Sequence, residues 1–304
     1  MSDLPILSVS WTQMTTWNDC KYKWWLKYNK RITPVHVSDG MSKGRIVHEL
    51  MQGLFDFQYK FQEKKKRPPS VDESMNYFQK ALGKLQPDPT DVQNIMVAAY
   101  VITRFIKEYQ PQEEAQYRTI AAELELRAKL ETERGRIFEL VGIIDRIMHN
   151  LRNGKNYLGE TKTHGARPWK PEKIEMDGQQ LVYIELARAM GWELEDILYL
   201  FINTWDYKTK ETYGYEKFFQ KELVIDRAQL RNGFLRELHD FVDEVYDFAE
   251  RGLRPRRSIG PHCGDCYFQS YCFGRLRGLR HSAALGRKYV VKEDKPSTEE
   301  SEDV

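Results

Sequence analysis

The chain has 304 residues, of which 41% are hydrophobic and 30% charged, as expected for a globular protein with a core. Its formal net charge of +2 at pH 7 is too close to neutral to indicate a partner. No run of eighteen apolar residues occurs, and the first residues lack the basic and apolar regions of a secretory signal. We therefore expect no membrane-spanning helix and a cytoplasmic location.

Hydrophobic periodicity predicts a helical first third, then strands, then a mixture of both. Apolar residues recur every three or four positions in the helical segments and every second position in the strands. Short turns, such as Asn-Gly at 153–154, predict that three strands form an antiparallel meander over 118–163. In chain order, the predicted elements are helices at 11–28, 42–62, 71–85 and 90–109, strands at 119–131, 136–150 and 156–164, a helix at 177–192, strands at 196–205 and 212–224, and a helix at 226–250.

This order of elements predicts the α/β fold class. We expect a mixed central β-sheet flanked by helices, with an N-terminal helical region and a C-terminal cysteine loop. One domain should cover 1–280, with a helical insertion at about 60–115. The acidic, polar end of the chain predicts a disordered tail over 281–304, and the stretch before it is rich in arginine.

Three charged residues in the predicted meander point to a common site. Asp145 interrupts an otherwise apolar strand, where a carboxylate needs a partner. Fifteen residues later the segment "GETKTH" brings Glu160 and Lys162, which share parity and project from one face of their strand. A hairpin of this length places Asp145 beside them. The pattern predicts two carboxylates and one ammonium at a single place.

Such a cluster has two interpretations. Two carboxylates bind a hard cation such as Mg²⁺ or Mn²⁺, which polarises a phosphate and activates water, while a lysine orients that water or balances charge. For an isolated Glu-x-Lys, however, a cross-strand ion pair on a solvated face is the more common explanation. His48 on a helix, and Gln179 and Tyr183 one helical turn apart, are likewise ordinary core or surface residues when considered alone.

Together these residues resemble the PD-(D/E)XK nuclease superfamily, and within it the RecB-like exonuclease branch. Four motifs of that branch occur in order, and the resemblance as a whole spans roughly residues 5–275. Ile144 stands where the superfamily often has proline. The motifs are Gly-x-x-x-His at Gly44–His48, Gly-x-x-Asp at Gly142–Asp145, Glu-x-Lys at Glu160–Lys162 and Gln-x-x-x-Tyr at Gln179–Tyr183.

The resemblance implies a role for each of these positions. His48, Asp145, Glu160 and the Thr161 carbonyl would hold Mg²⁺ or Mn²⁺, and Lys162 would be the catalytic lysine. Gln179 and Tyr183 would contact DNA or steady the site, with Gln180 as a rival for Gln179 because the double glutamine leaves the register open by one residue.

Four cysteines form a second group. Cys263, Cys266 and Cys272 follow a ligand-type C-x2-C-x5-C spacing, and Cys20 lies far upstream. The spacing alone fits zinc, an iron–sulfur cluster or buried free thiols. A RecB-like branch that includes the helicase–nuclease subunit AddB and CRISPR adaptation nucleases has one such cysteine before the nuclease motifs and three after them. That resemblance implies a [4Fe–4S] cluster joining the two ends of the domain, although Lys21 replaces a usual proline.

The resemblance as a whole implies a metal-dependent DNA nuclease, acting as an exonuclease on single strands or DNA ends in repair, recombination, phage DNA processing or CRISPR adaptation. A DNA-binding scaffold subunit that keeps the fold without catalysis is the alternative. The chain has no Walker A motif, so a partner helicase or CRISPR adaptation protein would assist it. The basic loop at 162–173 is the best candidate for contact with DNA.

Overall fold

The computed structural model describes residues 6–35, 39–85, 92–165, 174, 177–204 and 219–292. The fold separates into two compact units. We call the first, made of 1–3, 12–37 and 243–304, the terminal unit. The second, made of 4–11 and 38–242, is the sheet unit.

The sheet unit is built on a six-stranded mixed sheet, which confirms the predicted fold class. Its strands follow the order β1-β4-β5-β6-β7, with β3 also paired to β4. The bounds are β1 Leu7–Val9, β3 Tyr117–Glu131, β4 Ile137–Asn150, β5 Asn156–His164, β6 Ile197–Asn203 and β7 Phe219–Val224. Strands β3, β4 and β5 form the predicted antiparallel meander, whereas β5 and β6 are parallel.

Strand β4 is shared by three neighbours, and this positions the candidate site. Its full length pairs with β3 along one edge. On the other edge, β1 pairs in parallel with residues 138–140 and β5 pairs antiparallel with residues 146–149. The stretch 141–145 therefore faces a fork where β1 and β5 diverge. The sequence analysis missed β1, because three residues give too short a pattern to recognise.

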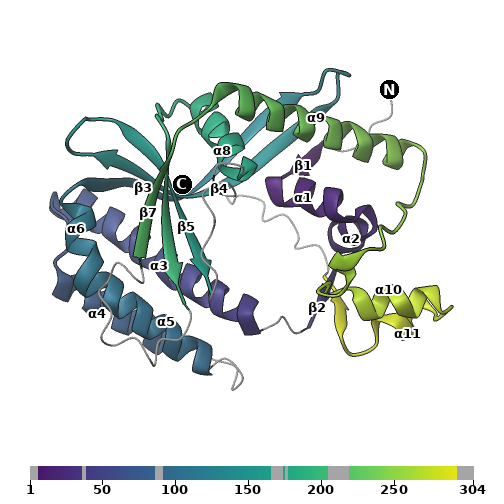
Figure 1. Ribbon diagram of the computed structural model, residues 1–304, viewed down its shortest axis with the longest axis horizontal. Helices are drawn as coiled ribbons and strands as arrows, with labels where there is room; N and C mark the ends of the chain where they lie inside the picture. The colour runs from purple at the N-terminus through teal and green to yellow at the C-terminus, as the bar shows by residue number, and fades with distance from the viewer. Residues whose placement is uncertain are drawn as a thin grey trace, which may run out of the picture. The chain divides into compact units, whose positions relative to one another are not determined.

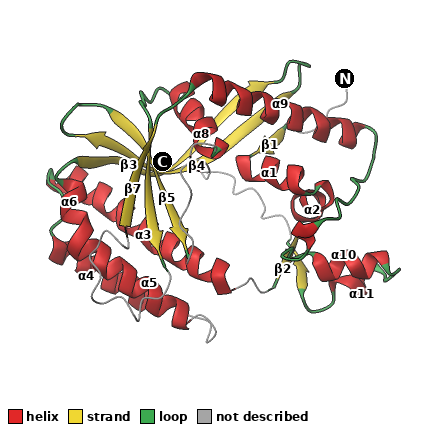
Figure 2. Cartoon of the chain, viewed as in Figure 1, coloured by secondary structure: helices red, strands yellow, loops and turns green. Residues whose placement is uncertain are grey.

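Helices cover both faces of this sheet (Figures 1 and 2). On one face α3, α4 and α5 pack with Leu200 and Ile202 of β6 into a buried core. Tyr199 of β6 has the opposite parity to Leu200 and Ile202, so its side chain points to the other face of the sheet. Its hydroxyl donates a hydrogen bond to Asp177, the N-cap residue of α8, so α8 lies on that face. A Ser70–Glu73 capping box starts α4. The bounds are α3 Asp39–Lys65, α4 Val71–Lys84, α5 Val92–Arg104, a π-helix Phe105–Tyr109, α6 Gln110–Glu114 and α8 Gly178–Ala189.

The terminal unit combines segments from both ends of the chain. Strand β2 pairs antiparallel with β8, and Tyr22 and Leu26 pack with Phe268, Tyr271 and Tyr289 into its own core. The bounds are α1 Trp11–Asp19, α2 Lys21–Trp24, a π-helix Trp25–Asn29, β2 Ile32–Pro34, α9 Ala228–Glu250 (of which the end from Asp243 belongs to this unit), a 3₁₀ turn Pro261–Cys263, α10 Gln269–Leu276, α11 His281–Leu285 and β8 Tyr289–Val291.

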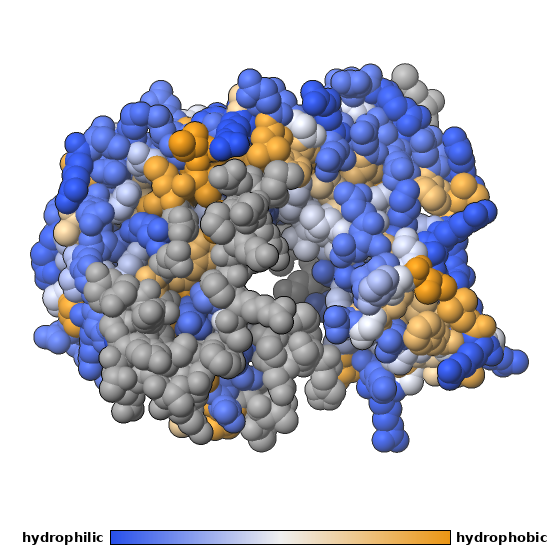
Figure 3. Space-filling model, viewed as in Figure 1, coloured by the Kyte–Doolittle hydropathy of each residue, from blue (hydrophilic) through white to orange (hydrophobic). Residues whose placement is uncertain are grey.

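Several boundaries differ from the sequence analysis. The single helix predicted at 11–28 is interrupted at Cys20, whose backbone is extended with φ −162°. The predicted tail starts too early, because α11 and β8 occupy part of 281–291. Residues 293–304, and the first residues of the strand predicted at 212–224, lie outside the described residues. None of the helices within the described ranges has the length and apolarity to cross a membrane. The face seen in Figure 3 is mainly hydrophilic with scattered apolar patches.

Candidate active site and cysteine pocket

Asp145 lies at the fork in the edge of β4. Its side chain is 9% exposed. Its Oδ2 atom accepts a hydrogen bond from the backbone N–H of Thr161, at 2.8 Å, just beyond the last β4–β5 pair, Arg146 with Gly159. The predicted placement of Asp145 beside the Glu-x-Lys strand is therefore what the fold adopts, and it puts the Thr161 backbone at the same point.

His48 reaches Asp145 from helix α3. Its Nε2 atom lies 3.3 Å from Asp145 Oδ1, and this hydrogen bond raises the pKa of His48. Gly44, one turn earlier, permits the approach, because a Cβ atom there would stand 3.1 Å from the Thr163 hydroxyl on β5. The Gly-x-x-x-His spacing thus has a local cause: a small residue lets α3 lie close to the strand that carries Glu160.

Glu160 and Lys162 project from the same face of β5, as their parity predicted. Lys162 Nζ lies 2.7 Å from Glu160 Oε1. Burial, together with the charge of Asp145, outweighs this ion pair and raises the pKa of Glu160. Burial acts to lower the pKa of Lys162, but the carboxylates of Glu160 and Asp177 overcome it and raise the pKa to about 12. The site therefore holds a buried carboxylate whose charge is poorly compensated.

Helix α8 supplies the glutamine and tyrosine motif. Gln179 Oε1 lies 3.4 Å from Lys162 Nζ. Tyr183 packs on Gly142 of β4, where a Cβ atom would come within 2.7 Å of the ring. Gln180 is fully buried, and neither of its amide atoms has a hydrogen-bond partner among the described residues. Of the two neighbouring glutamines, the structure brings Gln179 to Lys162 and leaves Gln180 away from it.

Two acidic residues at the site escaped the sequence analysis. Glu123 on β3 has a left-handed backbone with φ +51°, and its ladder neighbours place it opposite Asp145. It accepts a hydrogen bond from Gln52, while burial and the nearby Asp145 charge raise its pKa to about 7. Asp177 caps α8 and lies 3.5 Å from Lys162 Nζ. In the sequence, Glu123 is one of several glutamates in an alternating strand, and Asp177 gives only a helix-start signal.

The donor set at the fork suits a hard divalent cation. Within the part of the chain that the structure describes, no three His, Cys, Asp or Glu side chains already stand in a metal-holding arrangement. The chemistry nevertheless fits, because Asp145 and Glu160 are both buried and the charge of one raises the pKa of the other. A cation bound between them would remove that repulsion.

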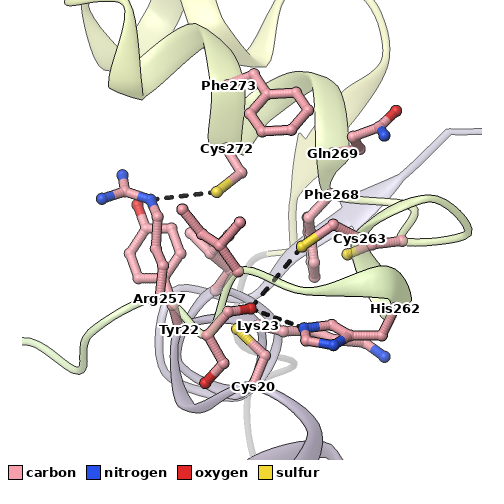
Figure 4. Close-up of a pocket in the computed structure, with 14 residues that line it drawn as sticks. Cys20, Tyr22, Lys23, Arg257, His262, Cys263, Phe268, Gln269, Cys272 and Phe273 are labelled. Carbon is pink, nitrogen blue, oxygen red and sulfur yellow. Dashed lines mark hydrogen bonds between the residues drawn. The ribbon is translucent and has the colours of Figure 1, made fainter.

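The four cysteines line one pocket in the terminal unit (Figure 4). Cys20 comes from the start of α2, and the other three come from the 3₁₀ turn, the loop after it and α10. The side chains Tyr22, Phe268 and Ile259 complete its wall. The resemblance implied that these distant cysteines would meet, and the fold does bring them to a common pocket.

Polar contacts hold two of the thiols. Arg257 Nε donates a hydrogen bond to Cys272 Sγ at 3.1 Å, and its guanidinium lies over the Tyr22 ring, 4.3 Å from the centroid. His262 Nε2 lies 2.7 Å from the Ser258 carbonyl, to which the Cys263 thiol also points. Burial raises the pKa values of Cys266 and Cys272, and nearby Cys20 and Cys263 add to the shift. Four thiols around one pocket fit a thiolate-bound metal or cluster.

We compared the chain with known protein families, curated proteins and solved structures. No curated protein gives a significant match. A crystal structure from Eubacterium rectale, of a protein called "Putative exonuclease", is similar over 85% of this chain and 87% of its own, with 12% identity and a TM-score of 0.47. That similarity is too low to support any conclusion about activity. The family model of the PD-(D/E)XK nuclease superfamily matches residues 8–273, which span the fork, helix α8 and the cysteine pocket. The chain therefore belongs to the PD-(D/E)XK nuclease superfamily.

Proposed function

We propose that this nuclease is a metal-dependent deoxyribonuclease that acts as an exonuclease on single-stranded DNA or DNA ends. The observation that carries the proposal is the fork in β4. It gathers two buried carboxylates, Asp145 and Glu160, beside the Lys162 ammonium. Hydrolysis of a phosphodiester requires an activated water and compensation of the charge that develops on phosphorus, and these three groups supply both when a cation is present.

Each residue has a distinct part in this proposal. Asp145, Glu160, His48 and the Thr161 carbonyl would hold Mg²⁺ or Mn²⁺, which supplies Lewis-acid activation of phosphate and water when bound. Lys162, an ammonium paired with carboxylates, would stabilise the negative charge of the transition state. Gln179 would orient Lys162 through its amide oxygen, and Tyr183 would fix α8 against β4.

The test is cleavage of end-labelled single- and double-stranded DNA with Mg²⁺ or Mn²⁺. Glu160→Gln and Lys162→Ala should abolish cleavage while the fold, followed by circular dichroism, is retained. Matched controls are Glu195→Gln and Lys155→Ala, which remove the same groups from an exposed ion pair. Normal cutting by both site variants would exclude this site. A wild-type protein that binds DNA in both metals without cutting it would favour a non-catalytic scaffold.

The mode of attack needs a separate substrate. An exonuclease requires a free end, so a closed single-stranded circle should resist the enzyme while its linearised form is degraded to short products. Cutting of the circle at a similar rate would show endonuclease action. We also propose that a partner helicase or a CRISPR adaptation protein delivers DNA to the site, in which case adding the partner should accelerate degradation of duplex ends.

We propose further that Cys20, Cys263, Cys266 and Cys272 hold a [4Fe–4S] cluster, with zinc as the alternative. The support is that all four line one pocket formed by segments from both ends of the chain. Protein purified without oxygen should be brown, absorb near 400 nm and contain about four iron atoms per chain. A colourless protein with one zinc per chain would replace the cluster by zinc. Cys20→Ser should lose the metal and lower the melting temperature.

A further inference from the structure

Asp177 occupies the N-cap position of α8, on the same side of the sheet as Glu160 and Lys162. Its Oδ1 atom accepts a hydrogen bond from the Gln179 backbone N–H at 3.3 Å, as helix-capping aspartates do. Its side chain is only 12% exposed. A cap alone does not require such burial, since the N-termini of helices are commonly capped at the surface.

The second carboxylate oxygen of Asp177 contacts residues outside α8. Oδ2 accepts a hydrogen bond from the buried Tyr199 hydroxyl at 3.1 Å and lies 3.5 Å from Lys162 Nζ. Lys162 Nζ thus has one carboxylate from its own strand, that of Glu160, and one from the start of α8. Tyr199 on β6 fixes the second carboxylate in place.

The contact between Asp177 and Lys162 matters because Glu160 has two proposed partners, the Lys162 ammonium and the cation. With no cation bound, Glu160 holds Lys162 at 2.7 Å. A carboxylate that binds a divalent cation shares its charge with that cation, so its attraction for a neighbouring ammonium weakens. Asp177 and Gln179 then remain to hold Lys162 Nζ at the site, and neither belongs to the proposed set of cation ligands.

We propose that Asp177 is a positioning residue, which keeps the Lys162 ammonium in place for the reaction when Glu160 is engaged by the cation. The inference rests on the proposed nuclease function and extends it to a residue outside the four motifs. It also explains why the side chain of the capping residue of α8 is only 12% exposed and is bonded to Tyr199. The cap and the charge of Asp177 are separable, because asparagine caps a helix about as well as aspartate.

The experiment therefore compares Asp177→Asn with Asp177→Ala. Asparagine keeps the cap through its single amide oxygen, removes the charge, and puts an NH2 group that can donate to the Tyr199 hydroxyl in the place of Oδ2. Alanine removes the cap, the charge and the partner of Tyr199. Asp72→Asn is the matched control, since Asp72 is an exposed aspartate in the first turn of α4. For each variant we would measure kcat, KM, the melting temperature, and the rate at which an amine-acylating reagent labels Lys162, followed by mass spectrometry.

For Asp177→Asn we expect kcat to fall about tenfold or more, KM to change by less than about twofold, and the melting temperature to stay close to that of the wild type. Lys162 should be labelled faster than in the wild type, with or without DNA cleavage. Asp177→Ala should lose kcat and melting temperature together. Asp72→Asn should match the wild type in every measurement.

Two results would overturn the inference. One is an Asp177→Asn variant with unchanged kcat, which would leave Asp177 as a cap alone. The other is unchanged labelling of Lys162 in that variant, which would show that Asp177 does not hold the ammonium. The labelling does not depend on cleavage, so it decides the matter even if the wild type cuts no DNA, a result that would instead reject the proposed function.

Discussion

The Asp145 carboxylate takes the place of a backbone carbonyl for Thr161. Where β5 leaves β4, the Thr161 N–H has no carbonyl of β4 opposite it within the ladder, and Asp145 Oδ2 accepts its hydrogen bond at 2.8 Å. The catalytic candidate therefore also holds the fork together. The Asp145 side chain supplies one more hydrogen bond between β4 and β5 beyond the last pair of their ladder.

This double role predicts different results for two substitutions. Asp145→Asn keeps an acceptor for the Thr161 N–H, so the fold should survive while DNA cleavage is lost with the charge. Asp145→Ala leaves a buried N–H without a partner and should cost about 1–3 kcal/mol of unfolding free energy in addition. Urea denaturation and cleavage assays measure the two effects. Equal stability of the two variants would contradict the structural role.

Cation binding should stabilise the folded protein. Because the charge of Asp145 opposes ionisation of Glu160, Mg²⁺ or Mn²⁺ should raise the melting temperature of the wild type, and the rise should grow with the logarithm of the cation concentration above its Kd. A chelator should reverse the effect. Glu160→Gln should show little or no increase, whereas Glu195→Gln, exposed and distant in the sequence, should respond as the wild type does. An equal response in Glu160→Gln would place the cation elsewhere.

Gly142 should tolerate no side chain. A Cβ atom there would lie 2.7 Å from the Tyr183 ring, so Gly142→Ala must push α8 away from β4. We expect a loss of about 1–3 kcal/mol of unfolding free energy from overpacking, and a lower kcat because Gln179 moves with the helix. Gly83→Ala is the control, since its Cβ meets open space in α4 and should stabilise the protein by about 0.5–1 kcal/mol. A neutral Gly142→Ala would contradict the close contact.

A buried ion cluster should make the free energy of unfolding depend on pH in the acidic range. Burial acts to raise the pKa of Glu113, but Arg146, at 2.7 Å, and Lys221 outweigh it and lower the pKa to about 2, below its ordinary value of 4.5. This carboxylate therefore stabilises the fold above about pH 4.5, and its contribution disappears as the pH falls toward 2.

Glu113→Gln tests that expectation. It leaves Arg146 buried without its anion and should cost about 3 kcal/mol at pH 7. The difference from the wild type, measured by urea denaturation, should narrow as the pH falls below about 4.5. A difference that stays constant down to pH 3 would show that Glu113 does not carry the charge we assign to it.

The sequence predicted the sheet well where the signal is local. Strands β3, β4 and β5 alternate in hydrophobicity over long runs, and their order and pairing follow from short turns. The spacing of Glu160 and Lys162 predicted a shared face, and their ion pair bears that out. Helix α1 and its continuation were joined in error, because the extended backbone at Cys20 has no strong local signal.

The parts that sequence could not predict depend on contacts between distant segments. The fork exists because β1, only three residues long, pairs with β4 across more than a hundred residues. Glu123 was hidden because alternation assigns a face to each glutamate of β3, and the irregular ladder with its left-handed backbone changes that assignment. Asp177 was read as a helix start, and its contact with Lys162 is tertiary.

Because the terminal unit combines segments from both ends of the chain, it cannot fold until synthesis is nearly finished. Its segment 12–37 leaves the ribosome more than two hundred residues before its segment 243–304. While the whole sheet unit is synthesised, the C-terminal residues that pack against Cys20, Tyr22 and Leu26 do not yet exist. Such non-local assembly is slow and exposes apolar side chains to wrong contacts. The nascent chain should be most vulnerable to aggregation in that interval, and the pocket lined by the four cysteines is complete only after synthesis has passed Cys272.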